Sequence, residues 1–192
     1  MKTVREIEKI KAVVLYILQE CGGTLDLITL FKKMYFAQQL YAARYGKTIF
    51  NDSFRAKRRG PVPSFTYHAL CCAYDGLDKA SEDVKAFDSS FEVFEKDGKR
   101  FVKALTNPEL KKIAGMELDV LQEVLEQTRN MNPNDLSEKS HDKAWKDSYK
   151  RAENDPKDDY ISIVNIAKAG GASKEILNYI RQRQQMEIFC AR

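Results

Sequence analysis

The chain has 192 residues with a net charge of +4, and 43% of its residues are hydrophobic and 31% charged. This length suits one domain with a proper core, and the composition excludes a disordered chain, a collagen and a low-complexity protein. No run approaches the roughly 20 apolar residues that span a bilayer, and residues 1–11 lack the apolar core of a signal peptide. We therefore expect a cytoplasmic protein, which also suits four cysteines without disulfide or zinc spacing.

The N-terminal part of the sequence predicts two helices. Residues 4–20 and 25–45 carry apolar side chains at a spacing of three to four, which is typical of amphipathic helices. Cys21-Gly22-Gly23 ends the first helix, Thr24 can cap the second, and Gly46 suits a left-handed C-cap. The short glycine turn predicts that the two helices are close neighbours.

A basic and proline-containing segment follows. Residues 48–56 are predicted to be extended, and the basic cluster after them leads into Gly60-Pro61-Val62-Pro63, whose prolines forbid a helix. Ser64 is predicted to cap a helix over residues 65–74. The cluster contributes to an uneven charge, because residues 1–60 hold 12 Lys/Arg against 5 Asp/Glu.

Residues 91–104 give the clearest local signal. Asp97-Gly98 is typical of a type I′ turn between two short strands. A two-residue loop places Phe94 opposite Phe101, with opposite charges paired next to them, so one register satisfies several cross-strand pairs. The sequence therefore predicts a β-hairpin.

The rest of the chain is predicted to be mostly helical. Asn107-Pro108 should open a helix, and Asp155, Asp158 and Asp159 should form an acidic surface loop. Further helical segments are expected at residues 136–140, 141–151, 161–167 and 174–189. The prediction is a mainly α (α+β) fold: a single domain over residues 1–192 with a small antiparallel β-hairpin.

Three stretches of the sequence resemble the Panacea domain family, also described as SocA-like or phage-associated GepA-like. The first is residues 30–38, Leu-Phe-Lys-Lys-Met-Tyr-Phe-Ala-Gln. The second is residues 49–56 with the Gly60-Pro61-Val62 turn, and the third is Leu136-Ser137 with His141 and Trp145. The resemblance covers about residues 24–145, so that residues 146–192 would be additional C-terminal helices; Ala144 stands where the family usually has proline.

The resemblance implies an antitoxin that neutralises a cognate toxin, encoded next to it, by direct protein binding in a toxin–antitoxin or phage-associated pair. It also implies structural roles for Gly60, Pro61, Val62, His141 and Trp145. Neither histidine and neither of the adjacent Cys71 and Cys72 has the partners that catalysis or a metal requires. We therefore expect no catalytic residue, metal or cofactor, and no enzyme activity.

The partner-binding surface is predicted around basic and aromatic side chains. The candidates are Lys32, Lys33, Tyr35, Arg58, Arg59 and Tyr67. Lys32 and Lys33 are expected at the rim of their helix, and Arg58 and Arg59 in a solvated basic loop that docks an acidic partner. The alternative is a nucleic-acid-binding transcriptional autoregulator, since clustered positive charges also contact phosphates.

Overall fold

The computed structural model describes residues 2–76 and 81–190; residues 1, 77–80 and 191–192 lie outside this description, and so do the outermost ends of the expected 1–192 domain. The described residues form nine α-helices, one short 3-10 helix and two three-stranded antiparallel sheets, which confirms the mainly α (α+β) class. The helices are α1 (Val4–Glu20), α2 (Leu27–Tyr45), α3 (Ser64–Asp75), α4 (Glu82–Asp88), η1 (Leu110–Lys112), α5 (Gly115–Gln127), α6 (Pro133–Lys139), α7 (Lys143–Asn154), α8 (Ile163–Ala169) and α9 (Lys174–Cys190). The strands are β1 (Thr24–Asp26), β2 (Phe54–Lys57), β3 (Gly60–Pro63), β4 (Phe91–Lys96), β5 (Lys99–Ala104) and β6 (Tyr160–Ile161).

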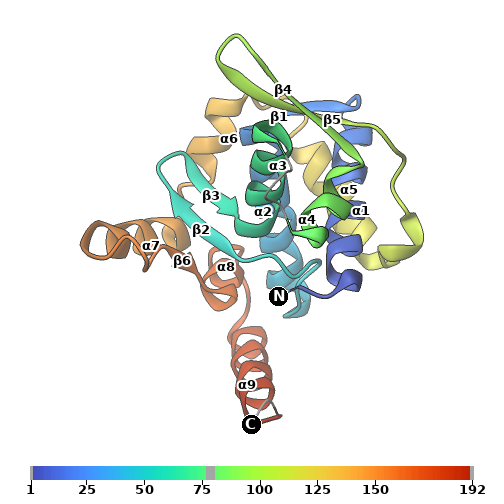
Figure 1. Ribbon diagram of the computed structural model, residues 1–192. Helices are drawn as coiled ribbons and strands as arrows, with labels where there is room; N and C mark the ends of the chain where they lie inside the picture. The colour runs from blue at the N-terminus through green and yellow to red at the C-terminus, as the bar shows by residue number, and fades with distance from the viewer. Residues whose placement is uncertain (1, 77–80, 191–192) are drawn as a thin grey trace.

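Helix α2 runs through the centre of the molecule. Leu30, Met34, Tyr35 and Ala37 on different faces of this helix are all buried, because α1, α5, α8 and β3 pack around it. Figure 1 shows α2 between the α1–α5 side and the β2–β3 hairpin. Full burial of each large apolar side chain contributes about 1.5–3 kcal/mol, so α2 is the element on which the other elements are assembled.

The predicted hairpin is present in the predicted register. Strands β4 and β5 pair with Phe94 opposite Phe101, whose rings stack with centroids 5.7 Å apart. A third strand, β1, pairs with β5 and was not predicted. The second helix therefore begins at Leu27 rather than residue 25, and its cap is Asp26, whose carboxylate accepts from the Thr29 amide at 3.0 Å, not Thr24.

The second sheet has the order β3-β2-β6, and its β2–β3 hairpin was predicted only as extended chain. Its edge strand β3 tolerates Pro61 and Pro63 because an edge strand has one side without ladder bonds. Strand β6 pairs with β2, placing Phe54 opposite Ile161. The helix predicted over residues 161–167 therefore begins two residues later, at Ile163.

Helix α3 is capped from a distance. The buried Asp52 carboxylate accepts hydrogen bonds from the Phe65 and Thr66 amides at 2.8 and 2.9 Å. Ser64, the predicted cap, is instead the first residue of the helix. Asp52 thus ties the extended segment before β2 to the helix after β3.

The prediction that a helix begins at Asn107-Pro108 is wrong. The chain forms only the short helix η1 there, and α5 begins at Gly115. The Glu117 carboxylate accepts a hydrogen bond from the Ala114 amide at 2.7 Å, which satisfies a free donor at the start of α5. This cap lies seven residues beyond the Asn-Pro signal.

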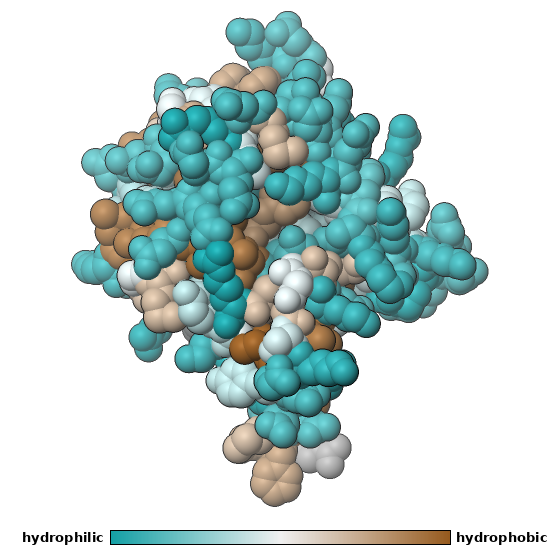
Figure 2. Space-filling model, turned by 180° about the vertical axis from the view of Figure 1, so that it is seen from behind, coloured by the Kyte–Doolittle hydropathy of each residue, from teal (hydrophilic) through white to brown (hydrophobic). Residues whose placement is uncertain are grey.

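Helix α9 packs by its first half only. Leu177 and Ile180 form a small cluster with Ala42 and Ala167, and the rest of the helix projects from the body (Figure 1). Figure 2 shows pale brown atoms at its free end; the exposed apolar residues there are Met186, Ile188 and Phe189. Among the described helices, none has both the length and the apolar character needed to cross a membrane.

Candidate functional site

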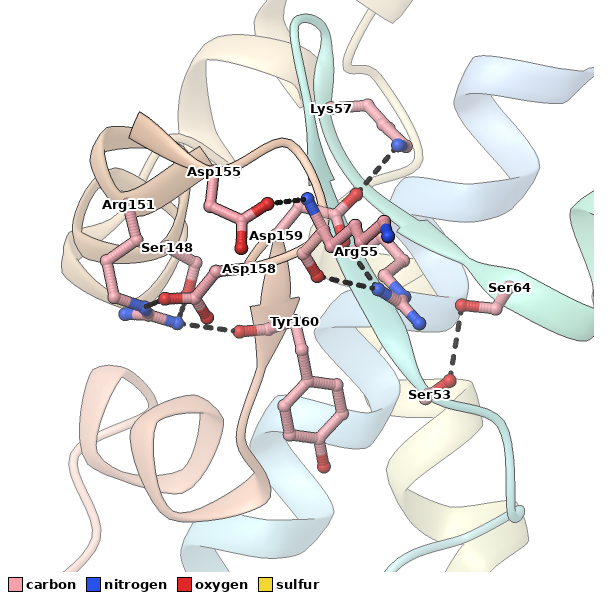
Figure 3. Close-up of polar contacts among 11 residues, drawn as sticks. Ser53, Arg55, Lys57, Ser64, Ser148, Arg151, Asp155, Asp158, Asp159 and Tyr160 are labelled. Carbon is pink, nitrogen blue, oxygen red and sulfur yellow. Dashed lines mark hydrogen bonds and ion pairs between the residues drawn. The ribbon is translucent and has the colours of Figure 1, made fainter. Parts of the chain in front are cut away.

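The structure divides the basic cluster into two pairs. Arg55 and Lys57 point to the Asp159 carboxylate, with nitrogen–oxygen distances of 2.6 and 2.7 Å (Figure 3). Burial alone would raise the pKa of Asp159, but hydrogen bonds from Lys57 and Arg55 outweigh it and hold that pKa below its usual value. Asp159 is buried and pairs with both cations of strand β2, so the predicted acidic surface loop is wrong for this residue.

The other pair, Arg58 and Arg59, forms the two-residue turn between β2 and β3, called here the basic turn. Both side chains are exposed, and neither forms an ion pair within residues 2–76 and 81–190. The basic turn therefore presents two positive charges that the described chain does not neutralise.

Three helices hold the basic turn through its backbone. Side chains of α2, α6 and α7 each donate a hydrogen bond to a carbonyl of the hairpin, at the alternate residues 57, 59 and 61. The bonds are Lys32 Nζ to Pro61 O at 2.7 Å, Ser137 Oγ to Arg59 O at 2.9 Å and Trp145 Nε1 to Lys57 O at 2.9 Å. We call these three donors the clamp. Because they come from separate helices, the clamp fixes the turn relative to the whole core.

Gly60 allows the clamp to approach. Its φ of +99° lies in the region that favours glycine. A Cβ at this position would lie 2.3 Å from the Ser140 hydroxyl and 2.8 Å from Cε of Lys32. Glycine is therefore required here both by backbone conformation and by space.

A partly buried carboxylate joins two of the clamp helices, α2 and α7. Asp142 accepts from the Tyr35 hydroxyl at 2.8 Å and from the Gln39 amide at 2.7 Å, both on α2. Its other oxygen accepts from the Trp145 amide at 2.9 Å and so caps α7. This bridge sets where Trp145 stands relative to α2.

Two aromatic rings stack on the Trp145 indole. The His141 ring stacks on it with centroids 3.8 Å apart, and Tyr149 stacks at 4.8 Å on the same helix. Burial, and then the charge of Lys32, lower the pKa of His141. The structural role of His141 beside Trp145 stays a prediction, and the stacking shows which contact a substitution would remove.

The residues predicted to bind a partner do not form one exposed surface. Lys32, Lys33 and Tyr35 are 1%, 4% and 0% exposed, so their predicted position at a partner-facing rim is wrong. Groups within the fold accept their hydrogen bonds: the Pro61 carbonyl for Lys32, the Thr128 hydroxyl for Lys33 at 2.8 Å, and the Asp142 carboxylate for Tyr35. Tyr67 is 47% exposed on α3 and packs edge-on against Phe31 of α2.

The motif residues, by contrast, come together. Gly60, Pro61, His141 and Trp145 all belong to the clamp or touch it, and Val62 packs against the core from the same strand. Sequence reasoning gave no role to Ser137, Ser140 or Asp142; the signal for Asp142 was an aspartate directly before a helix, a typical N-cap. In the part of the chain that the structure describes, no three His, Cys, Asp or Glu side chains converge as a metal site requires.

The fold and the site define a mainly α protein that presents a rigid basic turn on a small β-hairpin. Residues 30–146, more than half of the chain, match the family model described as "Antitoxin SocA-like, Panacea domain". The chain therefore belongs to this antitoxin-like family. No curated protein and no solved structure matches it significantly.

Proposed function

We propose that this protein is an antitoxin that neutralises a cognate toxin, encoded next to it, by direct protein–protein binding. The observation that carries the proposal is the family match over residues 30–146, since that family is described as antitoxin-like. In this proposal the protein acts by binding and catalyses no reaction. A cytoplasmic setting is part of the proposal, and the four free cysteines fit a reducing compartment.

The basic turn supports this function as the contact surface. Arginine is enriched among the residues that dominate binding energy in interfaces. A turn that is already fixed loses less conformational entropy when a partner binds. Arg58 and Arg59 would therefore dock on an acidic area of the toxin with little ordering cost.

The first experiment is co-expression with the neighbouring reading frames, followed by a pull-down on this protein. We expect one neighbour to be toxic alone, harmless together with this protein, and co-purified with it. If no neighbour is toxic and none binds, the antitoxin function is refuted for this chain.

Charge reversal then tests the contact surface. R58E/R59E should weaken the complex by about 10- to 100-fold, more at low salt than at high salt, because it replaces attraction by repulsion. The matched control is K96E/K99E, which changes the charge equally at the exposed turn of the other hairpin. Equal affinities of the two variants would remove the basic turn from the interface.

The same two unpaired arginines favour a second candidate, a nucleic-acid-binding autoregulator. The discriminating measurement is a titration with DNA of the protein's own promoter at several salt concentrations. Tight binding that R58E/R59E abolishes, without any toxin partner, would support this candidate.

A further inference from the structure

A second surface of the molecule has the form of a binding groove. It lies between the end of α1, β1, the first turns of α2 and the exposed side of α5, and its volume is about 900 Å³. Binding sites for ligands usually measure about 300–1,000 Å³. The groove is therefore larger than a single ion or side chain needs.

The floor of the groove is apolar. Its apolar lining residues, called here the floor, are Leu25 on β1, Leu125 on α5, Met131 in the α5–α6 connection and Pro133 at the start of α6. Leu25, Met131 and Pro133 keep part of their surface exposed, so an apolar side chain placed there would remove it from water. This feature favours an occupant with an apolar anchor.

The rim of the groove is acidic. Five carboxylates and two basic groups line the groove as a whole, a net charge of −3 in a chain whose total is +4. Glu123 is paired with Arg44, and Glu126 with Arg129. Glu20 on α1 and Asp119 on α5 form no ion pair within the described residues. Two walls of the groove thus offer carboxylates that are free to receive a cation.

Lys33 also lines the groove, but its side chain is buried and does not belong to the acidic rim. Its ammonium is held by the hydroxyl of Thr128 at 2.8 Å and by the carbonyl of the same residue at 3.3 Å. Burial lowers the pKa of Lys33, and its charge does not reach a carboxylate within ion-pair distance among the described residues. Glu20 and Asp119 therefore keep their charge for an external partner.

We propose that this groove binds an amphipathic basic segment of the toxin, with an apolar side chain on the floor and Lys or Arg at Glu20 and Asp119. The inference rests on the proposed antitoxin function and names a second contact surface with the opposite charge to the basic turn. Charge complementarity decides the occupant, because a protein of net positive charge attracts a cationic segment only at such a local acidic site.

The first arm of the test uses a synthetic peptide, so that it does not depend on the toxin. A fluorescent helical peptide of leucine and lysine should bind, and its leucine–glutamate counterpart should not. E20K/D119K should weaken binding by about tenfold or more, whereas E109K/E153K, an equal charge change at exposed carboxylates outside the groove, should leave it nearly unchanged. Equal effects of the two variants, or equal binding of a lysine–serine peptide without apolar side chains, would overturn the proposal.

The second arm uses the co-purified toxin. E20K/D119K should weaken this complex, and E109K/E153K should not. A complex that E20K/D119K leaves intact would overturn the groove as a toxin contact while the antitoxin function stands. The absence of any toxic, binding neighbour would instead refute the antitoxin function, and the peptide arm would still report on the groove.

Discussion

Replacing Gly60 with alanine tests whether the clamp holds the fold as closely as its contacts indicate. The new Cβ would lie 2.3 Å from the Ser140 hydroxyl and 2.9 Å from Nζ of Lys32. The φ of +99° would cost about 1–3 kcal/mol for any residue with a Cβ. The steric conflict adds to this cost, because both neighbouring groups are buried and already hydrogen-bonded.

The steric part follows from the bonds that must break. Ser140 donates to the Ser137 carbonyl at 2.7 Å, and displacing this buried hydroxyl costs about 1–3 kcal/mol. The Lys32 ammonium would be pushed from the Pro61 carbonyl, although its flexible stem can yield part of the space. Together we expect G60A to lower the free energy of unfolding by about 2–6 kcal/mol, a large part of a typical total of about 5–15 kcal/mol.

The assay is urea unfolding followed by circular dichroism, with a control that isolates the backbone term. Gly76 has the same φ of +99°, and no atom of residues 2–76 and 81–190 lies within 4 Å of its Cβ position, so G76A should cost only about 1–3 kcal/mol. In the G60A/S140A variant the closest contact is removed, and part of the lost stability should return as a coupling energy of about 1–3 kcal/mol. If G60A and G76A destabilise equally, the close approach of the clamp is refuted.

Two further predictions concern the clamp donors. Burial, and then the charge of Arg59, lower the pKa of Lys32 from 10.5 to about 7, so the unfolded chain binds more protons between these values and stability rises with pH across that window. Relative to K32M, the free energy of unfolding of the wild type should rise by about 3–4 kcal/mol between pH 7 and pH 10 in denaturant titrations. A difference between the two proteins that does not change with pH would contradict the lowered pKa of Lys32. Separately, W145F keeps a stacked ring but removes the indole N–H, which should cost about 1 kcal/mol and speed amide hydrogen exchange in the paired residues of the β2–β3 hairpin. Unchanged exchange there would show that this bond does not hold the turn.

The elements that the sequence predicts correctly are those specified by residues close together in the chain. The β4–β5 hairpin was predicted to the residue because the Asp97-Gly98 turn and the facing aromatic pair specify the same register within a few residues. Helix α1 was predicted with its exact bounds, since one apolar stripe and the glycines after it define both ends. Gly46 adopts the left-handed cap that was expected of it.

The parts that sequence reasoning missed depend on distant partners. The Arg58-Arg59 turn lacks the usual turn residues and is held by donors from three other helices. A lysine next to an apolar stripe normally reaches water, so Lys32 was placed at a rim; its burial requires the Pro61 carbonyl, 29 residues away. The three donors come from residues 32, 137 and 145, far from the turn in the sequence, so no local pattern around Arg58 and Arg59 indicates them.

The clamp holds the backbone of the hairpin and leaves the side chains of the basic turn free to contact a partner. All three donors bind main-chain carbonyls, at residues 57, 59 and 61, and none binds a side chain of the basic turn. Every amino acid supplies such a carbonyl, so the clamp does not depend on which side chains stand at positions 58 and 59. Gly60 is the exception, because any Cβ there meets the clamp itself. A scaffold of this kind can keep its turn in place while the exposed side chains at positions 58 and 59 change.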